Sequence, residues 1–125
     1  YTISYILKSH HPLISKIRKF VDHYLQSDKL PYHTDSGINF VNITTSGVNK
    51  GTGLELAAHQ MNIPTQEIVG IGDSGGDWQF MKKCGFTACP SGAADMLKKE
   101  VDYVAGRPTS RGTKEIIQYV LDNLV

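Results

Sequence analysis

The sequence has little of what secreted, membrane and nucleic-acid-binding proteins usually carry. Only two cysteines occur among its 125 residues, Cys84 and Cys89, without the further cysteines and histidines of a zinc site. No apolar run approaches the length that crosses a bilayer, and the N-terminus lacks a signal-peptide pattern. Thirteen Lys and Arg against twelve Asp and Glu leave a formal net charge of +1, without a basic stripe. We therefore expect a cytoplasmic protein with reduced thiols that binds neither nucleic acid nor membranes.

What is present is the composition of a folded globular protein. Hydrophobic residues make up 40% of the chain and charged residues 20%, and the length suits one hydrophobic core. The chain begins at Tyr1 rather than at a methionine, within a strand-like run. We therefore expect it to be a piece of a longer protein.

The first half of the chain alternates between strand and helix patterns. Apolar residues recur at steps of three and four from Leu13 to Leu25, which indicates an amphipathic helix. Around that helix the sequence predicts a strand over Thr2–Leu7, a loop over 26–37, a strand over Ile38–Ile43, and a helix that begins at Lys50 and ends before Pro64.

The second half is more regular. Residues 67–72 (EIVGIG) form a short apolar run, which is typical of a strand buried on both faces of a parallel sheet. After it the sequence predicts a short helix through Trp78 and Cys84, a strand over Phe86–Cys89, a helix through Ala93 and Leu97, a strand over Asp102–Val104, and a last helix entered at Gly112 or Thr113. This alternation, from residue 38 to the end, predicts βαβ units in a three-layer α/β fold.

Two carboxylates follow the buried strand directly, in the segment Gly72–Asp77 (GDSGGD). Ligands of open parallel sheets bind beyond the carboxyl ends of the strands, so Asp73 and Asp77 face the expected site. Paired carboxylates suit a hard cation, Mg²⁺ above all. The alternative is that both residues serve only the turn and the helix N-cap, which these residue types also favour.

The string GDSGG also occurs around the nucleophilic serine of chymotrypsin-like proteases, and Ala57–His59 echoes the stretch around their histidine. Those enzymes are all-β, with the histidine far upstream of the serine, whereas here fifteen residues separate His59 from Ser74 in a strand-and-helix context. We therefore do not interpret Ser74 as a hydrolytic nucleophile.

Lys50 stands at a predicted helix start just after a strand, between Gly47 and Gly51. A lone lysine is usually a solvated surface charge. This one can bring its ammonium group to the same strand-end region as Asp73, and a cation beside carboxylates describes a phosphate site.

These segments together resemble a known family. Val48–Gly51 (VNKG), followed by a helix and by 67–77 (EIVGIGDSGGD), is similar to motifs III and IV of the haloacid dehalogenase-like (HAD-like) phosphatases. The likeness covers residues 38–125 and is closest to the branch with a large α/β cap, which includes archaeal phosphoglycolate phosphatases and sugar phosphatases. It implies a Rossmann-like, partial parallel sheet, with residues 1–46 as the second half of the cap and residues 47–125 as the C-terminal part of the core.

The resemblance also implies roles for single residues. Lys50 would stabilise the charge of the transferring phosphoryl group, Asp73 would bind Mg²⁺, and Asp77 would help to hold the metal site. Lys50 and Ser74 are the candidates for binding phosphate. The family's nucleophile, the first aspartate of a DxD motif, is absent from this sequence, so the 125 residues alone should be inactive.

The expected activity is Mg²⁺-dependent hydrolysis of a small phosphorylated metabolite, such as phosphoglycolate or a sugar phosphate. Two alternatives stay open: a phosphotransferase or phosphomutase of the same fold, and a non-catalytic phosphate-binding module. The second is suggested by Gly76 and Gly92, which stand where the family usually has Asn. An N-terminal half, or a second copy of the chain, should cover the sheet edge and faces that this half leaves open.

Overall fold

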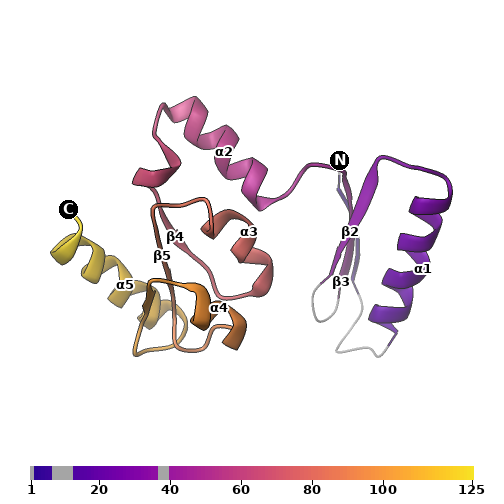
Figure 1. The fold of residues 1–125 in the computed structure, drawn as a ribbon. Coiled ribbons are helices and arrows are strands. Elements are labelled where there is room, and N and C mark those ends of the chain that lie inside the picture. Colours follow the sequence, from indigo (N-terminus) through magenta and orange to yellow (C-terminus); the bar gives the residue numbers. More distant parts are fainter. Residues whose placement is uncertain (1, 7–12, 37–39) are drawn as a thin grey trace. The chain divides into compact units, whose positions relative to one another are not determined.

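The computed structural model describes residues 2–6, 13–36 and 40–125 and divides the chain into two compact units, 1–48 and 49–125 (Figure 1). The expectation of one core, drawn from length alone, is therefore wrong. Two residues of the predicted strands, Leu7 and Ile38, lie outside the described residues. Among the residues that are described, no helix is both long and apolar enough to span a membrane.

The first unit is a three-stranded antiparallel sheet with one helix against it. Its elements are β1 (Thr2–Ile6), α1 (Ile14–Ser27), β2 (Tyr32–Ser36) and β3 (Phe40–Thr45). The strand order is β1-β3-β2, and Ile14 and Leu25 of α1 are buried, as is Val41 of β3. The hydroxyl group of Thr34 donates to the carboxylate of Asp22, which links β2 to α1. The predicted amphipathic helix is thus confirmed.

The loop predicted over residues 26–37 is wrong, because β2 lies within it. The sequence of this strand, YHTDS, is too polar to show an apolar alternation. Its backbone pairs with β3 along its whole length, from Tyr32 opposite Thr45 to Ser36 opposite Val41. As β3 belongs to this antiparallel sheet, the βαβ alternation begins at β4 and not at residue 38.

The second unit has a parallel sheet of order β4-β5-β6, as the apolar run at residues 67–72 predicts. Its strands are β4 (Val69–Ile71), β5 (Phe86–Cys89) and β6 (Tyr103–Val104). Its helices are α2 (Lys50–Met61), η1 (Thr65–Glu67), η2 (Gly75–Asp77), α3 (Trp78–Met81), α4 (Asp95–Glu100) and α5 (Thr109–Asn123). The last helix begins before the predicted Gly112, because the N–H of Gly112 already donates to the carbonyl of Pro108, the N-cap residue, at 3.1 Å.

Two buried clusters show how the layers of this unit form. Successive residues of a strand point to opposite faces, and in β5 Ala88 packs with Ala105 and Ile116, whereas Cys89 packs with Met81 and Leu97. Helix α5 therefore covers one face of the sheet, and α3 and α4 cover the other. This is the three-layer α/β arrangement that the sequence predicts.

Candidate functional site

The segment that follows β4 is fixed by backbone hydrogen bonds to the neighbouring strand and loop. The N–H of Gly72 donates to the carbonyl of Ala88 at 3.3 Å, and the N–H of Ala94 donates to the carbonyl of Asp73 at 2.9 Å. A Cβ atom at Gly72 would lie 2.5 Å from Cβ of Asp77, so only glycine lets the Asp77 side chain turn back against the strand end. The sequence thus places a buried carboxylate at the carboxyl end of a parallel strand.

Asp77 is the centre of this site. Its side chain is 10% exposed, and its Oδ1 atom receives the ammonium group of Lys50. Its Oδ2 atom accepts three hydrogen bonds, from the N–H of Asp73 at 3.1 Å and from the N–H and hydroxyl of Ser74 at 3.0 and 2.8 Å. Both carboxylate oxygens are therefore engaged by donors from the site itself.

The electrostatic consequence is a carboxylate that stays ionised. Burial raises the pKa of Asp77, but the hydrogen bonds from Lys50, Ser74 and Asp73 outweigh it and lower this pKa from 3.8 to about 2. Asp77 thus carries a full negative charge at neutral pH, and this charge holds the Lys50 ammonium group at the strand end.

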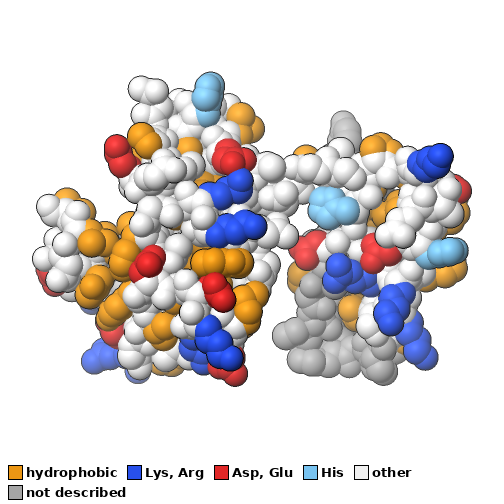
Figure 2. Space-filling view, in the orientation of Figure 1, with side chains coloured by type: hydrophobic (Ala, Val, Ile, Leu, Met, Phe, Trp, Pro, Cys, Tyr) orange, Lys and Arg blue, Asp and Glu red, His pale blue; other side chains and the backbone are white. Residues whose placement is uncertain are grey.

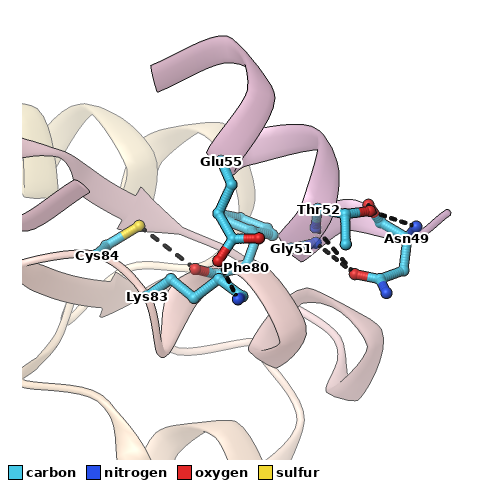
Figure 3. Close-up of polar contacts among 7 residues, drawn as sticks. All are labelled: Asn49, Gly51, Thr52, Glu55, Phe80, Lys83 and Cys84. Carbon is cyan, nitrogen blue, oxygen red and sulfur yellow. Dashed lines mark hydrogen bonds and ion pairs between the residues drawn. The ribbon is translucent and has the colours of Figure 1, made fainter. Parts of the chain in front are cut away.

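Lys50 reaches the strand end from the first residue of α2, as the sequence predicts, and its ammonium group meets Asp77 there rather than Asp73. Asn49 caps this helix: its side chain accepts the N–H groups of Gly51 and Thr52 at 2.8 and 3.1 Å (Figure 3). The Thr52 hydroxyl in turn accepts the N–H of Asn49 at 3.0 Å, which completes a capping box. The Lys50 side chain is 60% exposed, so its ammonium group remains open to a ligand.

Ser74 and Asp73 take different positions in the site. The Ser74 hydroxyl donates to Asp77 and forms the capping box of η2, a role that the spacing Ser-Gly-Gly-Asp signals in the sequence. Asp73 is exposed, and no described residue donates a hydrogen bond or forms an ion pair with its carboxylate. No group of three or more His, Cys, Asp or Glu side chains within the described ranges is arranged to hold a metal ion.

Three further features bear on the sequence predictions. His59 lies exposed in the last turn of α2, while Ser74 is bonded to Asp77, in keeping with the rejection of a serine nucleophile. A Cβ atom at Gly76 would meet only the Ser74 hydroxyl, at 3.8 Å, so this position has room for the asparagine of the family. Glu55 and Lys83, which pair beside the site, were not singled out by sequence reasoning.

Other surfaces of the second unit lie apart from these residues. A groove of about 480 Å³ runs along α5 between Tyr103, Arg107 and Lys114, and no residue of the site lines it. On the face drawn in Figure 2, acidic, basic and apolar side chains of this unit are interspersed. That face thus carries no extended field of one sign.

Comparisons with known proteins agree with this arrangement. Residues 2–117 match the family described as haloacid dehalogenase-like hydrolase. The chain is 38% identical over 98 residues to a phosphoglycolate phosphatase of Methanothrix thermoacetophila, covering 78% of the chain and 44% of that relative. It is 28% identical over 116 residues to a phosphoglycolate phosphatase of Staphylothermus marinus, covering 93% of the chain and 47% of that relative. The chain thus spans less than half the length of these curated relatives.

The fold agrees as well. A haloacid dehalogenase-like hydrolase from Bacteroides thetaiotaomicron superposes with a TM-score of 0.77 at 18% identity, over 95% of this chain and 43% of that one. With a family match that covers most of its length, the chain belongs to the haloacid dehalogenase-like hydrolases. The resemblance drawn from Lys50 and the segment Gly72–Asp77 is confirmed.

Proposed function

We propose that this chain forms the Lys50, Asp73 and Asp77 part of a Mg²⁺-dependent phosphatase that hydrolyses a small phosphomonoester. The observation that carries the proposal is the Lys50 ammonium group held on Asp77, beside the exposed carboxylate of Asp73 at the end of β4. Phosphoglycolate is the substrate class favoured by the names of the relatives at 38% and 28% identity. A sugar phosphate offers the same phosphomonoester chemistry.

Within this proposal, Asp73 is the residue of this chain that would bind Mg²⁺. Its carboxylate is exposed, and no described residue engages it, whereas the oxygens of Asp77 already receive Lys50, Ser74 and the Asp73 N–H. Asp73 would therefore hold the ion directly, and Asp77 would act by fixing the Asp73 backbone and Lys50. The bound ion would supply positive charge against the phosphoryl oxygens.

In the proposed reaction the nucleophile is a carboxylate outside this chain. It attacks phosphorus in line as the bond to the ester oxygen breaks, and the ester oxygen takes a proton from solvent and leaves as the alcohol. Water then hydrolyses the acyl phosphate, which releases inorganic phosphate and restores the carboxylate. Lys50 neutralises charge on the phosphoryl group as it transfers, because a positioned ammonium group offsets the repulsion between two anions. Ser74 contributes to phosphate binding indirectly. Its hydroxyl and N–H both donate to Asp77 and so stabilise the loop at the site.

The remaining assignments belong to the same proposal. Residues 1–46 form the second half of a cap and 47–125 the C-terminal part of the core, close to the division between residues 48 and 49. In the described chain β4 pairs only with β5, so an N-terminal half or a second copy would cover its other edge. The free Cys84 and Cys89 favour a cytoplasmic location.

The metal assignment is tested by titrating the chain with Mg²⁺ in a calorimeter. Replacing Asp73 by asparagine should weaken binding by about tenfold or more, because the amide keeps the shape but loses the charge that a hard cation requires. Asp122→Asn, at the exposed end of α5, is the matched control and should bind as the unchanged chain does. Equal affinity in the Asp73 and Asp122 variants would contradict the assignment.

A further inference from the structure

Helix α2 approaches the segment after η2 very closely, on the side where Lys50 begins the helix. Gly51 is buried, and a Cβ atom there would lie 2.6 Å from the backbone carbonyl oxygen of Gln79 and 3.0 Å from Cε of Lys83. Real Cβ atoms do not come so close to a backbone atom, and this oxygen cannot move without moving α3. Glycine at position 51 therefore sets how near α2 lies to α3.

One helical turn further along, an ion pair joins α2 to Lys83, which lies two residues beyond the end of α3. The Lys83 ammonium group meets the Glu55 carboxylate, with side chains 33% and 52% exposed (Figure 3). Gly51 and Glu55 are four residues apart and so lie on one face of α2. We call Gly51, Glu55, Gln79 and Lys83 the α2–α3 contact.

This contact bears directly on Lys50. The lysine ammonium group lies at the end of a flexible four-carbon stem that is 60% exposed, so packing of the side chain does not fix it. How far the ammonium group reaches is set by the position of the Lys50 backbone, directly before Gly51. Asp77, its partner, lies immediately before α3. The distance between α2 and α3 thus decides whether the ammonium group meets the carboxylate.

We infer that the α2–α3 contact positions Lys50: Gly51 admits the close approach of the two helices, and the Glu55–Lys83 ion pair holds it, so that the Lys50 ammonium group stays on Asp77. Gly51, Glu55 and Lys83 are positioning residues, since they act through Lys50. The consequence for catalysis rests on the proposed function, whereas the geometric effect on Lys50 does not.

A purely structural role makes a different prediction. If the Glu55–Lys83 pair contributed only to stability, breaking it would lower the melting temperature and leave the Lys50 ammonium group on Asp77. Helix α2 also supplies a matched control, because a Cβ atom at Gly53 meets nothing within 4 Å. Gly51→Ala and Gly53→Ala both replace a glycine in the same helix, and only the first pushes α2 away from α3.

The first readout is the NMR signal of the Lys50 ammonium group in the 125-residue chain, at low temperature and mildly acidic pH, assigned with Lys50→Arg. Such signals survive where the group is held in a hydrogen bond. We expect the signal in the unchanged chain and in Gly53→Ala, and its loss in Gly51→Ala. Glu55→Gln and Lys83→Gln should broaden it, and the exchanged pair Glu55→Lys with Lys83→Glu should restore it.

The second readout is activity, in a polypeptide extended upstream of Tyr1 to include the nucleophilic carboxylate, which we call the extended polypeptide. Displacing a catalytic group by about 1 Å can cost on the order of a hundredfold in rate, so Gly51→Ala should lower kcat by about tenfold to a hundredfold with KM little changed. Gly53→Ala should stay close to the unchanged enzyme.

The two readouts separate the inference from the proposed function. An extended polypeptide without any phosphatase activity overturns the proposed function, while the Lys50 signal still tests the contact. If the Lys50 signal persists in Glu55→Gln and in Lys83→Gln, the positioning inference is wrong. The inference is also wrong if the exchanged pair fails to restore the signal while the chain stays folded. These variants test the inference even if Gly51→Ala does not fold.

Discussion

Lys50→Ala in the extended polypeptide is expected to lower kcat by about a hundredfold or more, in line with the loss of one positioned electrostatic stabiliser. In the proposed reaction Lys50 offsets charge that develops as the phosphoryl group transfers, so its removal should raise the free energy of the transition state more than that of the bound substrate. The melting temperature should fall only modestly, because the Lys50 side chain is 60% exposed and Asp77 keeps the hydrogen bonds that it accepts from Asp73 and Ser74.

The measurement is steady-state hydrolysis of p-nitrophenyl phosphate with Mg²⁺, together with a thermal melt of each variant. Lys99→Ala, which removes an exposed lysine of α4, is the control and should leave kcat unchanged. If Lys50→Ala keeps its activity while its melting temperature falls, Lys50 is a structural residue. The phosphatase proposal would then lose its main support outside the segment Gly72–Asp77.

The second large effect concerns stability in acid and comes from Asp77. Its pKa is lowered from 3.8 to about 2 in the folded chain, so between these values the unfolded chain binds more protons than the folded chain. The contribution of Asp77 to the free energy of unfolding is therefore complete above about pH 4 and is lost as the pH falls through 2. At about 1.4 kcal/mol per pKa unit, it amounts to about 2 kcal/mol of unfolding free energy.

Asp77→Asn should remove this contribution and leave the donors of Ser74 and Asp73 facing an amide. We expect a loss of about 1–3 kcal/mol at pH 7, because the amide keeps one acceptor oxygen, and its NH2 group cannot accept the donors that faced the other carboxylate oxygen. The difference from the unchanged chain should shrink by about 2 kcal/mol as the pH falls to 2. Urea unfolding across this pH range measures it, with Asp122→Asn as an exposed control. If the difference in unfolding free energy does not change with pH, these contacts do not lower the pKa of Asp77.

Much of the second unit could be predicted from the sequence because its signals are local. A short apolar run marks β4, and apolar residues at three- and four-residue steps mark α5. Strand β2 could not be found in this way, because its residues are polar and its strand conformation depends on pairing with β3. Thr34 is buried, but Tyr32 on the same face is exposed, so the described side chains give no periodic pattern.

The candidate site, too, could be predicted only in part from the sequence. Motif spacing brought Lys50 and Asp77 to one strand end, and their contact agrees with that expectation. Spacing could not show that both oxygens of Asp77 are already engaged, which leaves Asp73 as the exposed carboxylate. Nor could it show that Glu55 meets Lys83, because a contact between residues 28 positions apart depends on how α2 packs against α3.

The central claim is that this chain contributes Lys50 and Asp73 to a phosphatase whose nucleophile lies outside it. Hydrolysis of p-nitrophenyl phosphate with Mg²⁺, measured side by side for the purified 125-residue chain and for the extended polypeptide, tests this claim most directly. We predict turnover by the extended polypeptide alone, because in the proposed reaction Lys50 and Asp73 stabilise charge and neither attacks phosphorus. Robust turnover by the 125-residue chain, lost in Ser74→Ala, would contradict the account and identify a nucleophile within the chain.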